Sequence, residues 1–183
     1  MSETKENNSS SDGIILRELR QEDNVNISLG SEYVALKNFL KKNAKDYHSK
    51  NLARTFVAVD NNSDIENQVL GYVTLVSSQI SLTKFRHPDD VAEYPYKDYP
   101  AVKIARLAVD TKHRMNGLGK YLIGWSIAIS IKKIMPFIGC RFLVVDSKPC
   151  AISYYEKNGF TLLDTEENKK NKHPLLFIDL HKL

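Results

Sequence analysis

Residues Arg106–Lys120, RLAVDTKHRMNGLGK, form the stretch of sequence that decides the fold. An apolar run is followed by a short polar loop, and Gly117 and Gly119 then lead into an apolar helical pattern. Glycines at this point let an anion approach the backbone, and the first-turn N–H groups of a helix are unpaired at its positive end. Because Arg114 and Lys120 add positive charge, the stretch predicts a strand–loop–helix cradle for a pyrophosphate.

Other glycine-containing loops fit this stretch less well. A Walker A loop needs Gly and Ser or Thr at positions that Arg114 and Tyr121 occupy. A dinucleotide fingerprint needs Gly or Ala in place of Leu122. The segment Gly124–Ala128 lacks one glycine of a nucleophile elbow and is expected inside a helix. A second strand–helix unit downstream, with its helix over Pro149–Asn158, supports the cradle.

The flanking segments predict a mixed sheet. Strands are expected over residues 14–19, 55–59, 69–76, 102–109, 141–146, 160–163 and 175–180, and helices from Gly30 through Tyr47 and over 117–135 and 149–158. Two strands joined by a crossover helix run parallel, so 102–109 and 141–146 should form a parallel pair in an otherwise antiparallel sheet. The fold class is therefore α/β or α+β. Residues 81–100, rich in proline and aromatics, are expected to form a long loop that lines a substrate entrance or packs down.

Length and composition favour one folded domain in the cytoplasm. The chain has 183 residues, of which 42% are hydrophobic and 26% charged, and we expect a disordered tail over residues 1–12 and one domain over 13–183. The polar N-terminus lacks a signal-peptide core, and the longest uncharged run, Tyr121–Ile131, is shorter than the roughly 20 residues of a membrane span. Cys140 and Cys150 are expected to be buried, reduced thiols.

The histidines predict no metal site, because none of the five has the spacing of metal ligands. The formal net charge of +4 is compatible with an anionic ligand. Lys37, Lys41 and Lys45 recur at intervals of four residues along the first expected helix. Like charges at this spacing weaken a helix slightly. The row is either a solvated face or a site for a polyanion, and the sequence leaves nucleic-acid binding by these lysines open.

Two motifs resemble those of a known superfamily. Arg-x-x-Gly-x-Gly after Leu-Ala-Val-Asp resembles motif A of the GNAT superfamily, the acetyl-CoA-dependent N-acetyltransferases. Ala151–Phe160, AISYYEKNGF, looks like its A-x-x-x-Y-x-x-x-G-F motif. The segments LKNFLKKNA, TFVAVD, QVLGYVTL and SYYEKNGF read most like the GNAT-fold toxins of bacterial toxin–antitoxin modules, which acetylate the amino group of aminoacyl-tRNA. Lys148 stands where many members have Asn, which suggests an extra cation near the site.

The resemblance implies a GNAT fold, with a mostly antiparallel sheet, one parallel pair and flanking helices, and it assigns roles to residues. Acetyl-CoA would bind at Leu107, Ala108, Val109, Arg114, Met115, Asn116, Gly117, Leu118, Gly119 and Lys120. Tyr155 would be catalytic and protonate the leaving thiolate. Its neighbour Tyr154 is expected to pack instead. The implied partners are aminoacyl-tRNA and an antitoxin protein, with a homodimer left open and no membrane contact.

The reaction expected is direct transfer of the acetyl group. An α-amino group titrates near ~8, so part of it is already neutral and no strong base is needed. A backbone N–H at the splayed strand end near Val109 would polarise the acetyl carbonyl. An acyl-enzyme on Cys150 is disfavoured, because no base is near it in sequence. Two alternatives remain: a GNAT enzyme for a small amine or a protein amino group, and a non-catalytic acyl-CoA-binding module, against which Tyr155 argues.

Overall fold

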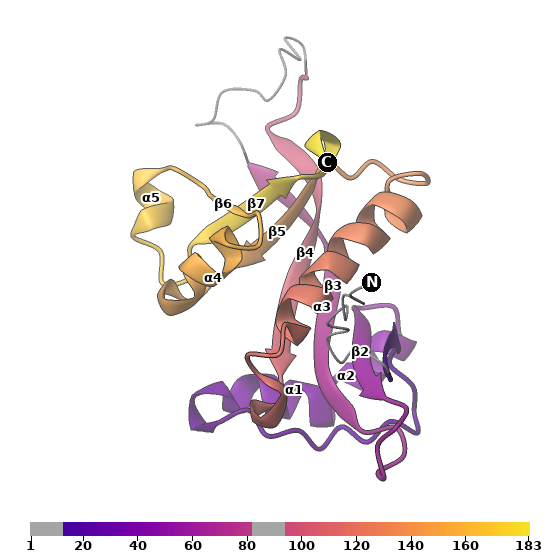
Figure 1. The fold of residues 1–183 in the computed structure, drawn as a ribbon. Helices are drawn as coiled ribbons and strands as arrows, with labels where there is room; N and C mark the ends of the chain where they lie inside the picture. The colour runs from indigo at the N-terminus through magenta and orange to yellow at the C-terminus, as the bar shows by residue number, and fades with distance from the viewer. Residues whose placement is uncertain (1–12, 82–93) are drawn as a thin grey trace, which may run out of the picture.

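The computed structural model describes residues 13–81 and 94–183, and strand β4 lies at the centre of its sheet. Within these residues seven strands form one sheet in the order β1-β2-β3-β4-β5-β7-β6 (Figure 1). They are β1 (Ile14–Glu18), β2 (Arg54–Asp60), β3 (Val69–Ser81), β4 (Asp98–Val109), β5 (Phe142–Asp146), β6 (Thr161–Leu162) and β7 (Leu175–Asp179). Among the described strands only β4 and β5 pair in parallel, which confirms the predicted mixed sheet.

Helices cover both faces of the sheet (Figure 1). They are α1 (Val34–Lys42), α2 (Ala44–Ser49), α3 (Leu118–Ile129), α4 (Ile152–Glu156) and α5 (Glu166–Lys169), with the short turns η1 (Ser31–Tyr33), η3 (Thr111–His113), η5 (Pro149–Ala151) and η6 (Leu180–Lys182). Successive strand residues point to opposite faces. Val57 and Tyr72 accordingly pack with α1 and α2, whereas Phe56 and Val73 pack with α3 and α4.

The parallel pair is short, and this opens the sheet on one side. β4 pairs with β5 only from Ala101 to Ile104, although it continues beside β3 to Val109. The β3–β4 register shifts by one residue at Ala105, a β-bulge that bends the strand. β5 diverges from β4 below this point (Figure 1). The N–H groups of residues 105–109 that face away from β3 therefore have no strand partner in the described part of the chain.

Several predicted boundaries need correction. The loop expected over residues 81–100 is shorter, because β3 runs on to Ser81 and β4 begins at Asp98. The polar residues of β3 beyond Val76 hide this extension, since that end of the strand is partly exposed. Tyr94 and Tyr99 pack with ring centroids 4.5 Å apart, so these aromatics fill space rather than line an entrance. Residues 82–93, with Phe85, lie outside the described residues, as does the expected tail over 1–12.

Two of the predicted helices differ in detail. The first is divided at Asn43, where the backbone leaves helical geometry before α2 begins. The long helix expected to Met135 is α-helical to Ile129 and continues as a π-helix, η4 (Ser130–Ile134). Within the described ranges, none of the helices combines the length and apolar character that crossing a membrane requires.

Candidate active site

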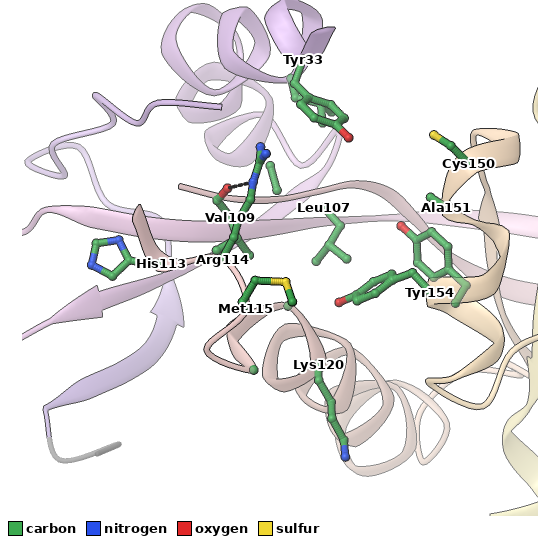
Figure 2. A pocket seen from close by; sticks show the side chains of 15 residues that line it. Tyr33, Leu107, Val109, His113, Arg114, Met115, Lys120, Cys150, Ala151 and Tyr154 are labelled. Atoms are coloured by element: carbon green, nitrogen blue, oxygen red, sulfur yellow. Dashed lines mark hydrogen bonds between the residues drawn. The ribbon is translucent and has the colours of Figure 1, made fainter. Parts of the chain in front are cut away.

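A cavity of about 460 Å³ lies where β4 and β5 diverge. Its walls are the end of β4, the start of α3, the η5–α4 segment and the η1–α1 segment (Figure 2). Eight of the residues predicted to bind the cofactor line it: Leu107, Ala108, Val109, Arg114, Met115, Gly117, Gly119 and Lys120. Asn116 is exposed and outside the lining, and Leu118 is buried against the sheet beside Ala58 and Leu70. The side chain of Leu118 therefore anchors α3, and only its backbone could meet a ligand.

The first turn of α3 is open toward the cavity. Gly117 is the N-cap residue with a φ of 77°, in the left-handed region that favours glycine, and it provides no side-chain cap. A Cβ atom there would meet no neighbour within 4 Å, so backbone conformation rather than crowding requires this glycine. The first turn contains no acidic residue. Its N–H groups are free of side-chain caps at the positive end of the helix dipole, an arrangement that suits a phosphate.

Arg114 departs from its expected position. Its Nη2 donates to the Leu29 carbonyl oxygen at 2.5 Å and its Nε to that of Val109 at 3.3 Å. The guanidinium carbon lies 5.1 Å from the centroid of the Tyr33 ring. The side chain thus points toward Tyr33, whereas Lys120 projects from α3 on the other side (Figure 2). The guanidinium charge lies at the η1 wall, and not at the first turn of α3 where the sequence suggested it.

Tyr155 and Tyr154 both line the cavity. Tyr155 is 9% exposed and its ring makes an edge contact with Phe160, and burial raises the pKa of its hydroxyl well above the ordinary value. Tyr154 is more exposed, and burial also raises its pKa. A methyl group added at Gly119 would overlap the Tyr154 hydroxyl, so this side chain reaches the start of α3. The expectation that Tyr154 packs elsewhere is wrong, because the cavity is wide enough to receive two successive helix residues about 100° apart.

The cavity carries a positive balance of charge. Its lining includes Arg114 and Lys120 but no carboxylate, within the residues the structure describes. Cys150 is exposed on η5 and lines the cavity, contrary to the expected burial, because the turn at Pro149 brings it to the surface. Cys140 is buried as expected, and burial raises its thiol pKa. Across residues 13–81 and 94–183, no three metal-ligating side chains gather in one place.

Two residues that shape the site do not stand out in the sequence: Tyr33, in the lining of the cavity, and Asp110, which follows β4 outside that lining. The buried Asp110 carboxylate accepts from the backbone N–H of Ser28 at 2.7 Å and of Lys112 at 2.9 Å. It therefore ties the loop after β4 to the segment that leads into η1. The sequence signal for this role of Asp110 is an aspartate at the start of a short turn. Tyr33 lines the cavity from a distant part of the chain, and no local pattern could have identified it.

The lysine row is interrupted. Lys37 and Lys41 lie on α1, but Lys45 lies on α2 beyond the break at Asn43. The Lys45 ammonium donates to the carbonyl oxygens of Gln21 at 2.6 Å and Asp23 at 3.0 Å. The prediction of three lysines on one continuous helix is therefore wrong, and Lys45 fastens α2 to the loop after β1.

Comparisons with known proteins agree with this geometry. A family model of the acetyltransferase (GNAT) domain matches residues 51–162. None of the curated proteins matches the sequence significantly. A solved structure described as AtaT complexed with acetyl-methionyl-tRNAfMet is 24% identical, with a TM-score of 0.78 over 92% of this chain and 96% of that chain.

Two further solved structures have a similar fold. A tyrosine-to-phenylalanine mutant of KacT is 23% identical, with a TM-score of 0.77 over 93% of this chain and 96% of that one. A mutant AtaT toxin bound to the C-terminus of the antitoxin AtaR and acetyl-CoA is 22% identical, with a TM-score of 0.71 over the same shares. Together with the family match, these confirm the resemblance that the two motifs indicated. The chain belongs to the acetyltransferase (GNAT) domain family.

Proposed function

We propose that this enzyme transfers the acetyl group of acetyl-CoA to the α-amino group of aminoacyl-tRNA and acts in the cytoplasm as the toxin of a toxin–antitoxin pair. The observation that carries the proposal is the cavity, which extends from the open first turn of α3 to Tyr155 and has no carboxylate in its described lining. Support for the acceptor comes from similar folds, because AtaT was solved with acetyl-methionyl-tRNAfMet and, as a mutant, with AtaR and acetyl-CoA.

The residues at the cavity fit acetyl-CoA. The first-turn N–H groups of α3 would hold the pyrophosphate, with Lys120 adding a charge. The unpaired edge of β4 over Leu107–Val109 would bind the pantetheine amides as a neighbouring strand would. The bound donor supplies an activated thioester carbonyl.

The chain's own groups account for the chemistry. N–H groups on the free edge of β4 would stabilise the negative charge that develops on the carbonyl oxygen during attack. The acceptor amine titrates near ~8, so its neutral form is available and its proton leaves to water. The raised pKa of Tyr155 keeps its hydroxyl protonated, so it would donate to the sulfur as the C–N bond forms and the C–S bond breaks. Water then restores the tyrosine proton.

The direct test is acetylation of charged tRNA. The purified protein would be incubated with acetyl-CoA and aminoacylated total tRNA, and aminoacyl adenosines released by nuclease would be examined by mass spectrometry. We expect N-acetylated species with charged tRNA, none with uncharged tRNA and far less with Tyr155→Phe. Turnover restricted to small amines or peptides would contradict the proposal, as would acetyl-CoA binding without any turnover.

A small amine or protein amino group is the second candidate acceptor. It is favoured by one observation, the engagement of Lys45 with backbone carbonyls, which shortens the basic row available to a polyanion. We also propose that residues 13–183 form one domain that associates with an antitoxin, and size measurements with and without that partner would test for a homodimer.

A further inference from the structure

Tyr33, at the rim of the cavity, is held by cations from two separate loops. The ammonium of Lys148, between β5 and η5, lies 4.6 Å from the centroid of the Tyr33 ring and donates to the Glu32 carbonyl oxygen at 3.2 Å. The guanidinium of Arg114, between η3 and α3, lies 5.1 Å from the same centroid and donates to the Leu29 carbonyl oxygen. Both loops therefore converge on the η1 segment, and each brings a positive charge to one aromatic ring.

These two cations retain unused hydrogen-bond donors. In the part of the chain that the structure describes, neither Arg114 nor Lys148 forms an ion pair with a carboxylate. A guanidinium has five N–H donors, and backbone carbonyls accept from two donor nitrogens of Arg114. An ammonium has three donors, and a backbone carbonyl accepts from one donor of Lys148. Both residues are exposed. The pair is therefore a fixed, uncompensated positive site with donors available for an anion.

The place of this cluster assigns it to the acceptor rather than the donor. Tyr33 and Arg114 lie at the wall opposite α3, across the end of β4 (Figure 2). The pyrophosphate of the donor would occupy the α3 side. We infer that Tyr33, Arg114 and Lys148 form a subsite for the phosphate of the terminal nucleotide of the acceptor, an inference that rests on the proposed aminoacyl-tRNA activity.

A phosphate fits this subsite better than a nucleobase does. Both cations lie over the tyrosine ring, so a base that stacked on the same face would have to displace them. Anchoring by backbone carbonyls also fixes the positions of the two charges, which reduces the ordering cost of binding an anion. A small amine without an anionic group cannot use this site.

The test compares three acceptors that carry the same amino acid. Aminoacyl-tRNA and an aminoacyl-CpA dinucleotide have the terminal phosphate, whereas aminoacyl-adenosine has none. With Lys148→Gln, we expect KM to rise about tenfold for the first two, as for loss of one charged hydrogen bond, and to stay unchanged for aminoacyl-adenosine. The slope of log(kcat/KM) against log[salt] for aminoacyl-tRNA should become shallower by about 0.7, the value for one single-strand phosphate contact.

Controls separate charge from simple support of the wall. Lys148→Arg should restore most of the activity, and Lys157→Gln, which removes an exposed lysine from the end of α4, should change neither KM nor the salt slope. An equal loss with aminoacyl-adenosine, or no loss with any acceptor, would overturn the subsite while the tRNA activity stands. Failure of the unmodified enzyme to acetylate all three, with acetyl-CoA binding intact, would instead overturn the proposed function and the subsite with it.

Discussion

One wall of the cavity consists mainly of backbone groups, and the opposite wall consists mainly of side chains. The α3 wall presents backbone groups, exposed by Gly117 and Gly119. The opposite wall presents the side chains of Tyr33 and Arg114, and Lys148, outside the lining, reaches the Tyr33 ring. Backbone carbonyls accept hydrogen bonds from both cations. A backbone wall suits a donor that is the same in every turnover. A side-chain wall can be altered by single substitutions, so it is where selectivity for the acceptor can be adjusted without loss of the donor site.

The largest expected effect comes from placing a charge on the backbone wall. In Gly119→Glu the new carboxylate stands at the first turn of α3 and displaces the Tyr154 hydroxyl, and we expect acetyl-CoA affinity to fall on the order of a hundredfold or more. Calorimetry would measure it. Gly124→Glu adds the same charge to an open, exposed position of the same helix and should bind normally. Equal affinity in the two variants would remove α3 from the donor site.

The next largest effect is expected at Tyr155, the proton donor that lies between the two walls. Tyr155→Phe removes only the proton donor, so kcat should fall by about 10²-fold, the low end of the range for general acid catalysis, with acetyl-CoA affinity retained. Tyr154→Phe removes a hydroxyl from the adjacent residue of α4 and should keep kcat within about threefold of the parent. Steady-state rates with saturating donor would measure both. Reversal of the two results would make Tyr154 the proton donor.

A smaller effect is expected from the lysines of α1, the helix that follows Tyr33. Changing Lys37 and Lys41 together to Glu should weaken tRNA binding and reduce the salt slope by about 1.5, if both contact phosphates. Lys45→Glu should instead destabilise the fold by about 1–2 kcal/mol, because two backbone carbonyls lose their donor. Filter binding and thermal unfolding would measure these. If Lys45→Glu alone weakened tRNA binding at unchanged stability, the basic surface would include α2.

The smallest effect concerns protonation. Burial raises the pKa of Tyr155, which favours the neutral hydroxyl, so this group ionises only above the ordinary range and remains a donor at working pH. The phenolate absorbance of Tyr155→Phe should therefore follow that of the parent up to about pH 11, one unit above an ordinary tyrosine, and fall below it only at higher pH. A deficit at lower pH would show that Tyr155 ionises earlier than its burial indicates.

The backbone wall could be predicted from the sequence, and the side-chain wall could not. The cradle is contiguous, because strand, loop and helix start follow one another within Arg106–Lys120. Tyr33 joins the site only through contacts between distant segments, among them the bond from Ser28 to Asp110. The direction of Arg114 depends on the same contacts. Lys148 stands out in the sequence as an unusual cation, but nothing in the sequence identifies Tyr33 as its partner.

Local rules also missed features that depend on tertiary context. The break at Asn43 has no proline or glycine to signal it, and Lys45 beyond it bonds to a loop that α2 meets only in the folded protein. The helical angle between Tyr154 and Tyr155 predicts packing for Tyr154, but it takes no account of the width of the cavity. The extension of β3 to Ser81 uses polar residues that read as loop.

The brevity of the β4–β5 pairing has a consequence for the order of folding. Strands β2, β3 and β4 pair in sequence order in antiparallel ladders, whereas β5 reaches β4 only after the α3 crossover and then forms just the Ala101–Ile104 register with Phe142–Val145. A strand pair that is distant in sequence and has few paired residues becomes stable late in folding, after the loop between the strands has closed. The cavity exists only once this junction has closed. Acetyl-CoA binding during refolding therefore reports the final assembly step, and we expect it to lag behind the appearance of sheet structure.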